Sequence, residues 1–169
     1  TGADSNRLAS LRAELSPAVP SLEMSETLIH IRHPRFQVQF DRRTGQLTIL
    51  DPSGKTIVEN IGPHAGRKFT VAEELRGRKT PIWPGDLLRH LQQLHADARQ
   101  PPEGIRLNVR GKYPRPDAPD ELLEGEYSLV ITRTGTREVS YNYTPINATG
   151  TFLEAGLALV MPATFSEFR

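Results

Sequence analysis

Residues 31–50 read IRHPRFQVQFDRRTGQLTIL, and this stretch decides the fold. Its first half alternates, with Phe36, Val38 and Phe40 on one side and polar residues between them, which is the pattern of a strand with one buried face. The segment DRRTG at 41–45 then places an aspartate that can accept backbone N–H bonds four residues before a glycine that tolerates positive φ. The residues after this glycine resume as a strand, so the stretch predicts an antiparallel hairpin.

The same signals continue along the chain. A second turn, DPSG at 51–54, precedes a third short strand, and residues 105–110 form another alternating run. The proline-rich residues 114–119 predict an exposed excursion between strands. At least seven strands with Gly- and Pro-rich connections and little helix predict an antiparallel β-sandwich. In the last third, three sets of residues are each expected to share a strand face: Tyr127, Leu129 and Ile131; Val139, Tyr141 and Tyr143; and Leu157, Leu159 and Met161.

Two segments need separate treatment. Between residues 85 and 100 leucines recur at helical spacing, yet the second half also alternates, so we expect a short helix over about 85–91 followed by a strand over about 93–100. Residues 1–24, with two prolines near their end, are expected to be an extended linker, and residues 25–169 the β-sandwich domain. The strand-like run that ends near Arg169 suggests that this domain continues beyond the chain.

The composition excludes several classes of function. The chain has 169 residues and no cysteine, which rules out thiol catalysis, zinc–thiolate sites and disulfides. Its 21 Lys plus Arg against 20 Asp plus Glu leave a net charge of +1, with no global signal for nucleic acid or an anionic membrane. The apolar runs are too short to cross a bilayer. We expect a soluble protein, cytoplasmic or, in a bacterium, periplasmic or secreted, without a nucleic-acid or membrane partner.

Candidate ligand-binding residues are few. His64, Arg67 and Lys68 belong to a glycine-rich, basic loop at 62–68, and Trp83 lies between two prolines, where its ring could stack on the C–H face of a sugar. For each of these four residues a surface or packing role is the simpler interpretation.

Catalytic and metal-binding patterns are absent from the sequence. Glu73 and Glu74 are adjacent and would point apart on a strand, and Glu121 and Glu124 flank the proline-rich excursion, so both pairs are expected to be solvated surface. The five histidines lack the spacing that brings metal ligands together. We therefore predict no catalytic residue, no metal and no cofactor.

Three motifs together resemble one family. They are Phe-x-Val-x-Phe-Asp-x-x-Thr-Gly-x-Leu at 36–47, the Gly-Pro pair at 62–63, and EAGLALVMPATF at 154–165. This combination resembles the C-terminal β-sandwich, called domain 5 or the small-chain domain, of glycoside hydrolase family 2 β-galactosidases. The resemblance covers residues 19–169 and implies a supersandwich of the galactose-mutarotase-like type. It departs from the family at 68–74, KFTVAEE, where an Arg-Ala-Pro-Thr-Asp-Asn-Asp type of segment usually follows.

The resemblance implies a non-catalytic role. In that family the two catalytic glutamates lie on a (β/α)₈ barrel earlier in the polypeptide, which this chain does not encode. The sandwich would pack on the barrel and help wall the cleft of an enzyme that cleaves a β-linked carbohydrate with retention. Its exposed strand edges would also permit a homodimer.

Two alternatives remain. One is a free-standing carbohydrate-binding or protein-interaction module, which would need an exposed line of aromatic side chains; the candidates Trp83, Tyr113 and Tyr141 are scattered in the sequence. The other is an adhesin or chaperone-like domain whose open edge strand takes a peptide.

Overall fold

A computed structural model describes residues 19–67, 71–76, 91–115, 118–147 and 152–162. Within them the chain forms eleven strands and one short helix, and all strand pairs are antiparallel. The predicted all-β antiparallel sandwich is confirmed. The strands make three sheets, with the orders β1-β2-β3-β4-β5, β10-β9-β8-β7 and β11-β6.

The five-stranded sheet is built from the N-terminal part of the chain. Its register places Val38 opposite Ile31 on one side and Ile49 on the other, which confirms the predicted hairpin. The end of the expected linker also belongs to this sheet, because Ser21 pairs with Arg32 and starts the first strand. The strands are β1 (Ser21–Met24), β2 (Leu28–His33), β3 (Phe36–Asp41), β4 (Leu47–Leu50) and β5 (Thr56–Val58).

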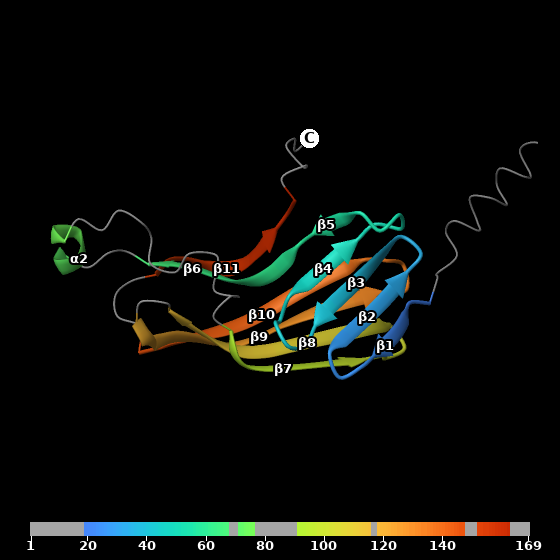
Figure 1. Cartoon of the computed structure of the whole chain (residues 1–169), viewed down its shortest axis with the longest axis horizontal. Coiled ribbons are helices and arrows are strands. Elements are labelled where there is room, and N and C mark those ends of the chain that lie inside the picture. Colours follow the sequence, from blue (N-terminus) through green and yellow to red (C-terminus); the bar gives the residue numbers. More distant parts are fainter. Residues whose placement is uncertain (1–18, 68–70, 77–90, 116–117, 148–151, 163–169) are drawn as a thin grey trace, which may run out of the picture.

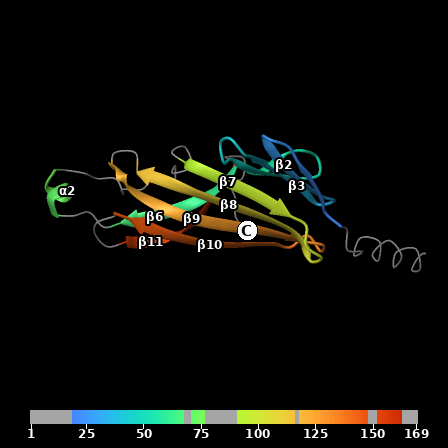
Figure 2. The same cartoon turned by 90° about the horizontal axis from the view of Figure 1, so that it is seen from below.

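The other two sheets contain the longest strands. The four-stranded sheet consists of β7 (Gln92–Arg99), β8 (Gly104–Arg115), β9 (Ala118–Thr132) and β10 (Arg137–Ile146), and the two-stranded sheet of β6 (Asn60–Arg67) and β11 (Phe152–Val160). Figure 1 shows the five-stranded sheet lying across the four-stranded sheet, and β6 and β11 running together beside it. In Figure 2 strands β7 to β10 are seen side by side from below.

The expected strand over 93–100 is confirmed as β7, whereas residues 85–90 of the expected helix lie outside the described residues. The helix that is described, α2 (Val71–Leu75), extends away from the sheets (Figure 1).

Two expectations about loops are wrong. Residues 62–67 of the glycine-rich segment at 62–68 form a strand and not a loop. Strand β11 pairs along β6 and provides hydrogen-bond partners for its backbone groups. The expected excursion at 114–119 is also shorter, since β8 continues to Arg115 and Pro114 is buried. Strand β7 pairs with β8 only as far as Lys112, so among the described residues β9 is the one neighbour of β8 at Pro114, and a missing N–H is tolerated there.

One hydrophobic core lies between the five-stranded and four-stranded sheets. The alternating residues of the opening hairpin supply one wall, and the predicted face of Tyr127, Leu129 and Ile131 supplies the other, all buried. Further members come from the first residues of β6 and from β7 and β8. The core cluster is Ile29, Ile31, Phe36, Val38, Phe40, Leu47, Ile49, Val58, Ile61, Ala96, Ala98, Ile105, Leu107, Val109, Tyr127, Leu129 and Ile131.

The turn between β3 and β4 is held by Asp41. One of its carboxylate oxygens accepts hydrogen bonds from the backbone N–H groups of Arg43, at 2.7 Å, and Thr44, at 3.1 Å. Gly45 closes the turn at φ 75°, and its N–H donates to the Asp41 carbonyl. The backbone bond from Arg43 is the main cause that lowers the pKa of Asp41.

Replacing Asp41 with alanine is expected to lower the free energy of unfolding by about 1 kcal/mol at pH 7, because two turn N–H groups lose their acceptor. Since the folded-state pKa of Asp41 is lowered, its contribution is complete above the unfolded-state value near pH ~3.9 and is lost as pH falls through the folded-state value. Urea titrations at pH 7 and at a series of pH values descending from pH 4 measure this. The exposed Glu26→Ala variant is the control, and an equal loss at both pH values would contradict the assignment.

Candidate functional site

The outer face of the four-stranded sheet is polar. Alternation along β8 and β9 turns Val109 and Tyr127 into the core, so their neighbours in sequence point outward. The register then aligns these outward residues into rows across the sheet. One row runs Arg110, Glu126 and Asn142, and the next runs Lys112, Glu124 and Thr144.

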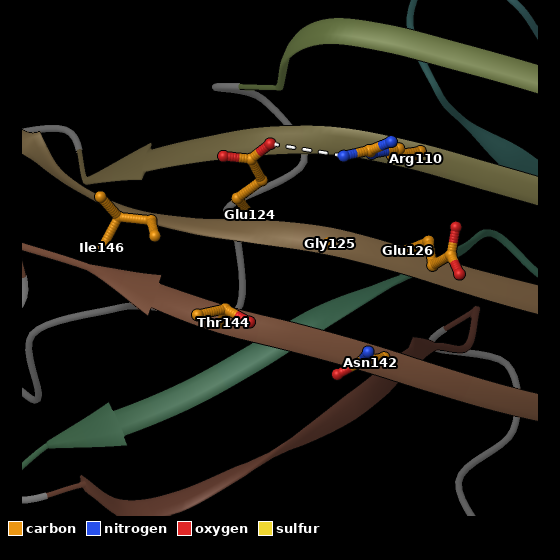
Figure 3. A pocket seen from close by; sticks show the side chains of 7 residues that line it. All are labelled: Arg110, Glu124, Gly125, Glu126, Asn142, Thr144 and Ile146. Carbon is orange, nitrogen blue, oxygen red and sulfur yellow. Dashed lines mark ion pairs between the residues drawn. The ribbon is translucent and has the colours of Figure 1, made fainter.

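A depression lies on this outer face. Its volume is about 470 Å³, within the usual range for small-molecule sites. Figure 3 shows that the lining side chains come from three neighbouring strands and surround the open backbone at Gly125. We call this hollow the outer-face depression; its lining residues are Arg110, Glu124, Gly125, Glu126, Asn142, Thr144 and Ile146.

The charges in and beside the outer-face depression balance. The Arg110 guanidinium lies 3.7 Å from one carboxylate oxygen of Glu124, and the Lys112 ammonium lies 3.8 Å from the other (Figure 3 draws the Arg110 pair). With Glu126 next to them, two cations face two anions. Ion pairs this exposed contribute at most about 1 kcal/mol to stability.

Two carboxylates in one depression raise the question of glycoside hydrolysis. Glu124 and Glu126 share a strand face and are about 6.6 Å apart along the strand. A glycosidase acid has to keep its proton near neutral pH, which requires an apolar or like-charged surrounding. Glu124 instead lies between two cations on an open sheet face, so we assign this pair no catalytic role. Glu121 and Glu124 are three apart on β9, which directs them to opposite faces.

All four tyrosines of the chain lie on the other face of the same sheet. Tyr127 is opposite Tyr141, and Tyr143 is opposite Gly125, so their side chains share the core-facing side. The rings of Tyr113 and Tyr143 meet edge to face at 5.7 Å, and those of Tyr141 and Tyr143 stack at 6.2 Å. We call these four residues the tyrosine cluster.

Three hydroxyls of the tyrosine cluster are buried and lack a hydrogen-bond partner among the described residues. They belong to Tyr113, Tyr127 and Tyr143. The hydroxyls of Tyr113 and Tyr143 are close enough to act on each other as hydrogen-bonding groups, although the pair does not meet the strict geometry of a hydrogen bond. Burial raises the pKa of Tyr113 to about 12 and the pKa of the other two above the usual value, so all three stay protonated near neutral pH.

Of the four candidate residues from the sequence, His64 is the one that the structure places near this cluster. His64 lies opposite Gly156 in the β6–β11 pair, so both project from the same face. A Cβ atom on Gly156 would be 3.5 Å from the hydroxyl of Tyr141. The side chain of His64 therefore projects from the face of the β6–β11 pair on which Tyr141 lies. Arg67 is the last residue of β6, and Lys68 and Trp83 lie outside the described residues.

Sequence reasoning missed both groupings. The outer-face depression has a signal in the sequence, the alternating polar residues of two long strands, but the partners in each row depend on cross-strand register. The tyrosines are scattered over 31 positions, from Tyr113 to Tyr143, and only the pairing of β8, β9 and β10 brings them together.

Comparisons with known proteins give no identification: no protein-family model matches the chain, and no curated protein matches it. Within the described ranges no three His, Asp or Glu side chains gather as a metal site would require. No helix in the described part of the chain is long and apolar enough to cross a bilayer.

Proposed function

We propose that this chain is a non-catalytic β-sandwich portion of a family 2 glycoside hydrolase of β-galactosidase type. It packs on the catalytic barrel of the parent enzyme and helps wall the carbohydrate cleft. The observation that carries this proposal is the outer-face depression, an open, polar hollow of sugar-binding size on the four-stranded sheet.

The chemistry of the depression suits an uncharged sugar. Each sugar hydroxyl both donates and accepts hydrogen bonds, so a site needs groups of both kinds. Arg110 offers donors, Glu126 offers acceptors, and Asn142 and Thr144 offer both. The lining residues Arg110, Glu124 and Glu126 carry one positive and two negative charges, and Lys112, which lies beside the depression at 3.8 Å from Glu124, offsets the excess, so an ionic ligand has no strong advantage over a neutral one.

The pairing of two family motifs supports the family assignment. Gly62 and Pro63 are almost a hundred residues from the closing run at 154–165, yet Ala158 lies opposite Gly62 and Leu157 opposite Pro63. The same two-stranded sheet thus holds the Gly-Pro pair and residues 154–160 of the closing motif. The third motif, at 36–47, forms the central strand and the turn of the five-stranded sheet.

The parent enzyme would then hydrolyse a terminal β-glycoside with retention, using two glutamates of its barrel. This chain contributes binding and shape to that reaction and no acid, base or nucleophile. A free-standing carbohydrate-binding module is the second candidate. It is favoured by one observation, the exposed ring of Tyr141, which stacks on the ring of Tyr143.

Titrating the ¹⁵N-labelled chain with methyl β-galactoside tests the proposed function. Backbone signals at 124–126 and 142–144 are expected to shift, and no galactose is expected to appear. Because a cleft wall supplies only part of a binding site, these shifts should stay far from saturation, with a Kd weaker than about 1 mM. Saturation of the same signals below that concentration would favour the free-standing module.

Two variants locate the binding. Asn142→Ala removes a donor and an acceptor from the outer-face depression and is expected to reduce the shifts at 124–126 at least by about half. Ser140→Ala is the matched control, since Ser140 is exposed on the same face of β10 but does not line the depression. Hydrolysis of the galactoside by the purified chain, or shifts that Asn142→Ala leaves unchanged, would overturn the proposal.

A further inference from the structure

We propose that β10 is the contact strand of a homodimer, in which it pairs antiparallel with β10 of a second copy of this chain. The two four-stranded sheets then join into one continuous sheet across a two-fold axis at Tyr141. The pairing uses the edge of the sheet and needs no sugar, so the proposal does not depend on the glycosidase assignment.

The first argument is that the outer edge of β10 is open. Strand β10 borders the four-stranded sheet (Figure 2), and among the described residues no strand pairs with it on the side away from β9. Eight of its ten residues are exposed, including the apolar side chains of Val139, at 39%, and Tyr141, at 51%. Strand β11 approaches β10 where Gly156 lies near the Tyr141 hydroxyl, at the far end of that side chain, and does not pair with the backbone edge.

The second argument is that this edge lacks the usual protection against pairing. Proteins protect exposed edges with short strands, bulges and charged side chains. Strands β1 and β5 are four and three residues long, β7 and β11 contain register shifts, and β6 contains two glycines and a proline. Strand β10 instead pairs with β9 over ten residues without a register shift, and its central residues 139–144, VSYNYT, carry no charge. It is the longest regular edge in the described part of the chain.

The third argument is the direction of the backbone groups of β10. Where β9 turns into β10, the N–H of Thr132 donates to the carbonyl of Thr136 at 3.0 Å. Bonded pairs alternate along an antiparallel ladder, so the even-numbered residues of β10 direct their backbone groups to β9 and the odd-numbered residues direct theirs to the open edge. Pro145 is odd-numbered, so its missing N–H leaves the β9 ladder intact. Donors and acceptors are therefore open at Arg137, Val139, Tyr141 and Tyr143.

The fourth argument is that β10 complements a second copy of itself. With Tyr141 on the two-fold axis, the open backbone groups of residues 139, 141 and 143 all find partners, and Pro145 is the outermost residue of the pair. On the core-facing side Tyr141 lies opposite Tyr141 of the partner subunit, and Val139 opposite Tyr143 of the partner subunit. Aromatic and β-branched pairs of this kind stabilise antiparallel strands.

The charges of the edge also favour a second copy over a charged peptide. In this register no like charges are opposed, because Glu138 lies opposite Thr144 of the partner subunit. The uncharged centre of β10 offers a peptide of either charge no electrostatic attraction, whereas two copies meet there without repulsion. The partner strand that fits best is therefore β10 itself.

Disulfide cross-linking tests the proposed register. The chain has no cysteine, so Tyr141→Cys introduces a single thiol. In the dimer the two thiols face each other across a bonded pair, with Cα atoms about 5.5 Å apart, which a disulfide spans. Ser140→Cys is the matched control, because its thiols point outward and their Cα atoms are more than about 7 Å apart. Under mild oxidation Tyr141→Cys is expected to form covalent dimer at least about tenfold faster.

Sedimentation velocity measures the dimer of the original chain without a cross-link. At about 100 μM the chain should sediment with twice the mass of one copy, because an interface of one strand pair is small and its Kd is expected in the micromolar range. Val139→Pro removes an N–H at the open edge and no bond to β9, whereas Val139→Ala keeps that N–H. The proline variant loses two hydrogen bonds per dimer, so its Kd should exceed that of Val139→Ala by at least about tenfold.

Three results would overturn the proposal. One is a chain that stays monomeric at this concentration, which would leave the edge to a strand of another protein. Another is equal cross-linking of Tyr141→Cys and Ser140→Cys, which would show that the copies meet elsewhere. The third is equal Kd values for Val139→Pro and Val139→Ala while both variants keep the circular dichroism spectrum of the original chain.

Discussion

Replacing Phe40 with alanine is expected to lower the free energy of unfolding by about 3–5 kcal/mol, because a large ring is removed from the centre of the core. Phe40 is fully buried at the end of β3, the central strand of the five-stranded sheet. It lies opposite Ile29 on one side and Leu47 on the other, both also buried. Truncation leaves a space between three packed strands, and the strand backbones cannot collapse into it.

Urea denaturation at pH 7 measures this loss. A domain of this size has a total stability of about 5–15 kcal/mol, so Phe40→Ala should leave a marginal protein with a much lower midpoint. Leu75→Ala is the control, because Leu75 is an exposed apolar residue on α2. The free energy of unfolding of the Leu75→Ala variant should fall by no more than about 0.5 kcal/mol. A Phe40→Ala variant as stable as the Leu75→Ala variant would contradict a sandwich core centred on this strand.

Replacing Gly104 with alanine is expected to cost about 3 kcal/mol or more. Gly104 starts β8 at φ 153°, a conformation that side chains rarely adopt, and its N–H donates to the Pro101 carbonyl. A Cβ atom there would overlap with the carbonyl oxygen of Ile131. That oxygen belongs to the backbone of β9, so the strand itself would have to move. The β8–β9 pair, which carries the outer-face depression, would shift at its end.

Gly54→Ala is the matched control for Gly104→Ala. Gly54 also has a positive φ, 88°, but a Cβ atom there meets nothing within 4 Å. The free energy of unfolding of this variant should therefore fall only by the cost of the unfavourable backbone conformation, about 1 kcal/mol. Thermal denaturation of both variants measures the difference. If the two variants unfold at the same temperature, the close approach of Gly104 to β9 is not present in the protein.

The parts of the fold that were predictable have local causes. Alternation from Phe36 to Phe40, followed by an Asp-to-Gly turn, depends on residues within one hairpin, and the structure confirms that hairpin residue by residue. The same holds for the buried face of Tyr127, Leu129 and Ile131. Strand periodicity reflects burial on one side, and a sequence records it directly.

The parts that were not predictable depend on distant partners. The 62–67 segment looks like a loop because glycine and proline are rare in strands, yet β11 pairs along it. Pro114 looks like a breaker, but in the described part of the chain β8 pairs there with β9 alone. Ser21–Met24 follows two prolines and has no clear alternation, and pairing with β2 makes it a strand. In each case tertiary pairing overrides local preference.

The two groupings follow the same rule. Arg110, Glu126 and Asn142 form a row only through the registers of two strand pairs. Tyr113 and Tyr143 are thirty residues apart and meet edge to face because β8 and β10 flank β9. His64 is the one sequence candidate with a structural setting, and that setting depends on Gly156, a residue of the closing motif.

The most direct test of the proposed role is a single titration of the ¹⁵N-labelled chain with methyl β-galactoside, followed by NMR for both binding and cleavage. If the chain contacts carbohydrate and has no catalytic residues, the backbone signals at 124–126 and 142–144 should shift while the galactoside stays intact. Release of galactose that increases with protein concentration, or a spectrum that does not change at those positions, would contradict it.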